Sequence, residues 1–146
     1  MKTLKFQFFL FIGLFVLVAC SFVQKNNAEK HHLHRKWMLV EYKGFTKEEL
    51  TKQNAYIDLS KNSENKNQYG AKMGCNKMFF SAEFKDENLV KFSQIGSTLM
   101  YCDGKMQLEE AFSKDLPLMN QYEIEGHFLS LSNGNIKMKF VAEDWD

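Results

Sequence analysis

The sequence predicts an α+β domain in which a strongly curved antiparallel sheet, a half-barrel of about eight strands, wraps around one amphipathic helix. Two observations lead to this fold class. Apolar and polar residues alternate with period two through most of the chain after Trp37, and only the stretch from Asp103 to about Leu116 has helical periodicity. The chain has 146 residues, and the part after Trp37 has the length of one domain with a modest core.

The expected strands are separated by residues that favour turns. Asn133-Gly134 is typical of a two-residue hairpin turn, because both residues tolerate positive φ, and Asp86-Glu87-Asn88 marks another turn. After the hairpin, apolar residues and lysines alternate, so that strand has one wet face. The expected strands are residues 37–42, 55–59, 68–73, 77–84, 89–95, 122–124, 128–131 and 136–140.

The expected helix has a start signal, a stop signal and one apolar face. Asp103 can cap its first turn, and Pro117 cannot continue it. Its apolar residues recur at spacings of three, four and eight, which places them on one side, and this face is formed by Leu108, Ala111, Phe112 and Leu116. On the same helix the adjacent Glu109 and Glu110 face different directions, so they are not a general acid/base pair, and solvated or capping roles are expected for them.

The first residues predict an export signal and a lipid anchor. A lysine-containing start leads into an apolar run that ends at Cys20 and is shorter than the ~20 residues of a membrane-spanning helix, so residues 1–19 are expected to be a cleaved signal peptide. Leu17-Val18-Ala19-Cys20 resembles the lipobox of bacterial lipoproteins, which implies that Cys20 carries acyl chains such as palmitate. Residues 20–36 are expected to form a flexible tether and residues 37–146 the domain. Ser21, in place of the aspartate that retains some lipoproteins at the inner membrane, favours the outer membrane, facing the periplasm.

Charge limits the expected partners. Loss of residues 1–19 removes Lys2 and Lys5, which leaves 17 basic against 18 acidic residues. This balance gives no reason to expect a nucleic acid. The expected partners are the membrane, through the lipid anchor, and an unidentified protein or hydrophobic ligand; neither a cofactor nor a metal site is expected. The tether histidines, His31, His32 and His34, can bind metal or serve only as polar linker.

Cys75 and Cys102 remain once Cys20 is used for the anchor. A disulfide between them would close a 28-residue loop and add ~3 to 4 kcal/mol in the chain-entropy model. In a plain meander the two cysteines would be ~20 Å apart, whereas a bridge needs Cα atoms within ~7 Å. A bridge therefore requires residues 96–101 to cross at the end of the preceding strand, and two buried free thiols are the alternative.

A cysteine nucleophile and an exposed aromatic residue are further possibilities. His127, the one histidine within the expected domain, lies beside a hairpin turn, where a histidine is usually exposed, so a thiol enzyme is the least favoured function. Phe79 and Phe80 are consecutive in an expected strand, so one faces away from the core if the other faces it. Either a groove, a second layer or a partner covers the outer ring, or the sheet curls enough to bury both.

Two motifs resemble the META domain family, also called HslJ-like. They are Gly74-Cys75-Asn76 and the segment from Ser97 to Cys102, followed by a helix with Glu109-Glu110-Ala111-Phe112. The resemblance extends from Trp37 to Trp145. Where members commonly have a glycine after the motif cysteine, this chain has Phe79-Phe80-Ser81, which puts in doubt any local bulge. The motif positions are Gly74, Cys75, Asn76, Thr98, Met100 and Cys102.

The resemblance implies a function class rather than a reaction. Members are frequent among bacterial envelope lipoproteins, are linked to stress response and have no established enzymatic activity. The expected function is therefore a non-enzymatic, lipid-anchored binding or stress-related module. The alternative is a carrier or pilot that holds an acyl chain or hydrophobic peptide between sheet and helix, because secretion-system pilot lipoproteins have a similar shape.

Overall fold

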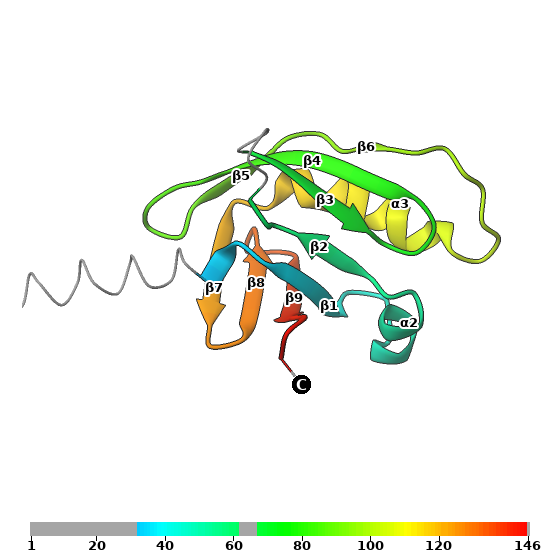
Figure 1. The fold of residues 1–146 in the computed structure, drawn as a ribbon, viewed down its shortest axis with the longest axis horizontal. Coiled ribbons are helices and arrows are strands. Elements are labelled where there is room, and N and C mark those ends of the chain that lie inside the picture. The colour runs from blue at the N-terminus through cyan, green and yellow to red at the C-terminus, as the bar shows by residue number, and fades with distance from the viewer. Residues whose placement is uncertain (1–31, 62–66, 146) are drawn as a thin grey trace, which may run out of the picture. The chain divides into compact units, whose positions relative to one another are not determined.

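The structure, a computed structural model, describes residues 32–61 and 67–145, which build one antiparallel sheet (Figure 1). The strands follow the order β5-β4-β3-β2-β1-β9-β8-β7, and the short β6 also pairs with β4. Their bounds are β1 (Lys36–Tyr42), β2 (Tyr56–Asp58), β3 (Gln68–Lys72), β4 (Lys77–Phe84), β5 (Val90–Phe92), β6 (Gly96–Ser97), β7 (Gln121–Glu125), β8 (Phe128–Ser132) and β9 (Lys137–Ala142).

The two outer strands meet at one place, so the sheet is nearly closed. Leu89 bridges Gln121, and the N–H of Val90 donates to the carbonyl of Asn120 over 3.0 Å. This confirms the predicted class, a strongly curved antiparallel sheet around one amphipathic helix. The predicted strands are all present, although the 89–95 strand already ends at Phe92, and a short strand that was not predicted, β6, follows it.

The long helix α3 (Met106–Asp115) starts later than predicted. The prediction that Asp103 caps this helix is wrong, because Lys105 occupies the N-cap position. No side chain caps the helix there. Residues 103–105 form a turn instead, in which Gly104 has a φ of +68°. The 3₁₀ helix η1 (Leu116–Leu118) contains Pro117 and ends the helical region as expected. Of the predicted apolar face, Leu108, Phe112 and Leu116 are fully buried and Ala111 is half-buried.

A second helix, α2 (Lys47–Lys52), was not predicted. It has six residues, and Leu50 is its buried residue, so it is too short for a periodic pattern to stand out. Its sequence signal is the capping box: the backbone N–H of Glu49 donates to Thr46 Oγ1, and the Thr46 N–H donates to the Glu49 carboxylate. The helix follows β1 directly in the chain.

Side chains fill the interior of the barrel. Trp37, Ile57, Phe112 and Phe140 are all fully buried and belong to one apolar cluster. Along β4 buried and exposed residues alternate, and Phe80 is 4% exposed while Phe79 is 56% exposed. One of the two neighbouring rings therefore does face outward. No helix in the described ranges is long and apolar enough to cross a membrane.

The folded unit begins before the predicted boundary at residue 37. Leu33 is 1% exposed and belongs to the core cluster, and the Trp37 indole N–H donates to its carbonyl over 2.9 Å. The compact unit accordingly begins at Leu33, within the stretch that the sequence assigned to the tether. The predicted signal peptide, Cys20 and the tether up to residue 31 lie outside the described residues.

Candidate functional site: a groove between α3 and residues 97–101

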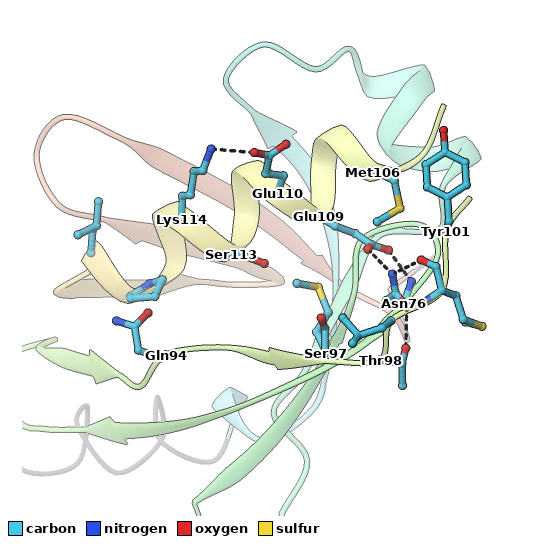
Figure 2. A pocket seen from close by; sticks show the side chains of 15 residues that line it. Asn76, Gln94, Ser97, Thr98, Tyr101, Met106, Glu109, Glu110, Ser113 and Lys114 are labelled. Carbon is cyan, nitrogen blue, oxygen red and sulfur yellow. Dashed lines mark hydrogen bonds and ion pairs between the residues drawn. The ribbon is translucent and has the colours of Figure 1, made fainter. Parts of the chain in front are cut away.

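We call residues 97–101 the lip. An open groove of about 710 Å³ lies between α3 and the lip (Figure 2). Asn76, in the loop before β4, and Met78, in β4, also line it, and η1 contributes Pro117 and Leu118. Eight large apolar side chains are exposed in the described residues, and four of them line this groove: Leu99, Met100, Tyr101 and Leu118. Leu99 is 97% exposed. The groove thus gathers apolar surface that folding alone leaves in water.

Glu109 connects the helix to the start of β4. Its carboxylate accepts a hydrogen bond from the backbone N–H of Cys75 over 2.6 Å, a very short one from the N–H of Asn76, and one from Asn76 Nδ2 over 2.9 Å. Glu109 is 5% exposed, so the predicted solvated or capping role is wrong. Glu110 faces a different direction from Glu109, as predicted: it is exposed, and its carboxylate pairs with Lys114 over 2.9 Å.

Asn76 connects the loop before β4 to the lip. Its Oδ1 accepts hydrogen bonds from the Met100 N–H and from Thr98 Oγ1, both over 2.8 Å, and its Nδ2 donates to the Met100 carbonyl over 2.9 Å. The side-chain amide thereby pairs with Met100 as a neighbouring strand would. Asn76 is 2% exposed, so its end of these bonds is buried, and together they tie the lip to the loop before β4.

The structure places Cys75 and Cys102 at disulfide distance, with Cα atoms 6.0 Å apart. The ~7 Å limit for a bridge is therefore met. The reason is that the lip does not turn back as a further antiparallel strand. Gly96 and Ser97 continue along β4, opposite Phe79 and Met78, and the chain then reaches the start of β4. Both cysteines are half-buried, and their link fixes the end of the lip that leads into α3.

Gly74 allows this junction to pack closely. Its φ is +138°, and a Cβ there would lie 2.5 Å from Gln53 Oε1 and 3.2 Å from the carbonyl oxygen of Lys105. A side chain would therefore push apart the segments around α2, β4 and α3. The family motif residues Gly74 and Asn76 thus lie at one junction with Thr98, which is more than twenty positions further along the sequence.

The departure from the family pattern leaves β4 regular. Phe79 and Phe80 pair with Gly70 and Tyr69 of β3 without a register shift. On the other side of β4, the Phe79 ring lies over Gly96, where any Cβ would clash with it. The exposed ring therefore covers the glycine in the neighbouring strand.

The other candidate residues lie elsewhere. His127 is in the turn between β7 and β8, where its ring stacks on Trp145 with centroids 3.4 Å apart; it is half-buried, not simply exposed. His34 Nδ1 lies 3.2 Å from the Leu59 carbonyl oxygen, and His31 is outside the described residues. Within residues 32–61 and 67–145, no three His, Cys, Asp or Glu side chains are grouped to hold a metal ion.

A buried polar contact fixes the far end of α3. The Tyr42 hydroxyl donates to the Asp115 carboxylate over 2.6 Å, and Lys43 lies 3.1 Å from the same carboxylate. Burial, and then the hydrogen bond to Asp115, raise the pKa of Tyr42 far above its usual range. Sequence reasoning did not identify Asp115 or Glu109, because the partners of each are distant in sequence; one signal for Glu109 was its position three residues before Phe112, on the buried side.

Comparisons with known proteins agree with this architecture. The sequence model of the META domain family matches residues 30–145. A protein from Burkholderia xenovorans solved by NMR is similar in fold, with a TM-score of 0.66 at 17% identity over 81% of this chain and 88% of that one. A DUF4847 family protein from Bacteroides vulgatus ATCC 8482, solved by crystallography, has a TM-score of 0.53 at 10% identity over 82% of this chain and 99% of that one. No curated protein matches the sequence.

Proposed function

Because the chain belongs to the META domain family, we propose that it is a non-enzymatic, lipid-anchored protein of the bacterial cell envelope whose domain acts by binding. The binding site is the groove between α3 and the lip. The observation that carries this proposal is the concentration of exposed apolar side chains on one preformed concave surface.

The rigidity of the groove supports a binding role. The lip is exposed from Ser97 to Tyr101, yet Asn76 binds both sides of the Met100 backbone and Cys102 lies at disulfide distance from Cys75. Exposed coil of this kind usually moves freely. Because the geometry of the lip is set before a ligand arrives, less conformational entropy is lost on binding.

The bonding of the reactive groups supports a non-enzymatic role. The Glu109 carboxylate already accepts three N–H groups, and a disulfide would leave neither Cys75 nor Cys102 as a nucleophile. His127 stacks on Trp145 in the turn between β7 and β8. A general base directed at a nucleophile, the usual arrangement for covalent catalysis, is not found among these groups.

The anchor and the location complete the proposal. Residues 1–19 act as the signal, Cys20 is acylated, and the remaining tether connects it to the domain that starts at Leu33. A disulfide between Cys75 and Cys102 suits an oxidising compartment outside the cytoplasmic membrane. We place the protein at the outer membrane facing the periplasm, with a role under envelope stress.

Two experiments test the proposal. Cys20→Ala in the full chain should remove acylation, measured by incorporation of labelled palmitate, and should move the protein out of the membrane fraction; continued membrane association would contradict the anchor.

For the groove, Leu99→Asp should weaken the retention of copurified ligand in native mass spectrometry. The matched control is Leu89→Asp, because Leu89 is exposed and lies outside the groove; equal effects of the two variants would contradict a binding role for the groove.

The alternative function, a carrier of an acyl chain, has fewer possible binding places than the sequence suggested. An acyl chain cannot lie inside the barrel, because the interior is filled by side chains such as Trp37 and Phe140. It would have to lie in the groove, where Met78, Met100 and Met106 offer adaptable apolar contacts. Retention of a fatty acid that Leu99→Asp abolishes would favour this alternative.

A further inference from the structure

One edge of β6 faces the groove. β6 pairs with β4 through Met78 opposite Ser97 and Phe79 opposite Gly96, and the Thr98 N–H donates to the Lys77 carbonyl over 3.0 Å. Because backbone groups alternate in direction along a strand, the N–H and C=O of Ser97 point away from β4. In the described residues, β6 has a strand partner on the β4 side alone, and Ser97 lines the groove.

The barrel is closed next to β5 but not next to β6. At β5 the neighbouring strand is supplied by β7, through the Leu89 and Gln121 bridge and the Tyr122 N–H bonded to the Asn88 carbonyl. Further along the same edge, α3 and η1 form the opposite wall of the groove. The groove therefore follows the free edge of the sheet. The ten residues of α3 give it a length of about 15 Å, which matches four to five residues of extended chain.

The charged side chains that line the groove already have partners within the protein. Glu110 and Lys114 pair with each other at 2.9 Å, and the Glu109 carboxylate is occupied by the N–H groups of Cys75 and Asn76. An uncharged occupant complements this lining, because a charged one would have to leave water without an opposite charge.

An occupant that covers the edge must also form hydrogen bonds. Covering the Ser97 N–H and C=O without partners costs free energy, because each group gives up its hydrogen bonds to water. An acyl chain presents only methylene groups at that edge, and these form no hydrogen bonds with Ser97. A polypeptide in extended conformation offers both donors and acceptors at the spacing of a strand, and directs alternate side chains at the apolar lining.

We therefore infer that the ligand is an uncharged, extended peptide segment, with alternating apolar residues, that adds as a strand to the free edge of β6. This inference rests on the proposed function of the groove and names the class of its ligand. The partner that carries such a segment is another protein of the envelope.

The test uses defined probes and a pair of variants. The peptide probes are synthetic eight-residue peptides with capped ends, in which valine, isoleucine, leucine or phenylalanine alternates with serine or threonine; the lipid probe is palmitate. Ser97→Pro removes the outward N–H of β6 and leaves the Thr98 bond to Lys77 intact, since proline is tolerated where the N–H of an edge strand faces outward. Ser97→Ala is the matched control, because it changes the side chain and keeps the N–H.

At least one peptide should bind the unchanged protein and Ser97→Ala equally, and Ser97→Pro at least tenfold more weakly, by calorimetry. Nuclear Overhauser contacts should place its backbone beside Ser97. The same peptide with N-methyl groups on alternate residues should lose binding to the unchanged protein, a result that holds even if Ser97→Pro fails to fold.

Peptide binding that neither proline nor N-methylation weakens would overturn strand addition. Binding of palmitate with no binding of any peptide would overturn the inference while leaving the groove as a binding site. Absence of binding by both probe classes would overturn the inference and the proposed function together.

Discussion

Replacing Glu109 by alanine should be among the most damaging single substitutions in the domain. It removes the acceptor for the backbone N–H groups of Cys75 and Asn76, while the third donor, Asn76 Nδ2, keeps the Met100 carbonyl. Each buried donor left without a partner costs about 1 to 3 kcal/mol, so we expect the free energy of unfolding to fall by about 3 to 5 kcal/mol. This is a large share of the ~5 to 15 kcal/mol that stabilises a typical domain.

Two related variants make the prediction specific. Glu109→Gln keeps one acceptor oxygen but turns an amide N–H₂ toward Asn76 Nδ2, so its cost should be intermediate. Glu110→Ala loses only an exposed pair with Lys114, which is worth about 0.5 kcal/mol or less.

Urea denaturation of the domain from residue 33 onward, followed by tryptophan fluorescence, gives all three values. The reasoning would be refuted if Glu109→Ala cost less than about 1 kcal/mol or no more than Glu110→Ala.

Three further predictions concern other parts of the domain. Gly74→Ala should cost at least about 2 kcal/mol more than Gly134→Ala, because both glycines have positive φ but the space around Gly134 is open; equal urea midpoints would contradict the close packing. Burial and its hydrogen bond raise the pKa of Tyr42, so its contribution to stability is complete below about pH 10 and is lost as the pH rises further. Tyr42→Phe should flatten this alkaline fall in the free energy of unfolding, and an unchanged slope would contradict the assignment. Cys75 and Cys102 should resist alkylation until the protein is reduced, and reduction should cost about 3 to 4 kcal/mol; alkylation without reductant would instead indicate free thiols.

The strands could be predicted because burial in this sheet follows the chain. In β4 every second residue is buried, and each apolar residue at those positions contributes to the alternating pattern. Elements without such a pattern were missed: β6 has two residues, too few for any period. The helix α2 was missed for the same reason, although Thr46 and Glu49 carry a capping signal that a search for turns and caps can recognise.

The site could be predicted only in part, because its contacts join distant segments. The sequence singled out Gly74, Asn76 and Thr98 through the family resemblance, but gave no reason for their chemistry. Asn76 meets Glu109 across 33 positions, and a charged residue on a helix is normally exposed. The role of Glu109 therefore becomes visible only when the helix is placed against the start of β4.

The arrangement separates the residues that build the groove from those that can select a ligand. Asn76 and Glu109 are buried and use their polar atoms on the backbone of the lip and of the loop before β4. Leu99 and Tyr101 are 97% and 82% exposed and border the groove. Since the lip is held through the Met100 backbone and the Thr98 hydroxyl, the side chains of Leu99 and Tyr101 can change without loosening it. The same support can therefore present different apolar side chains at the groove with little change in stability.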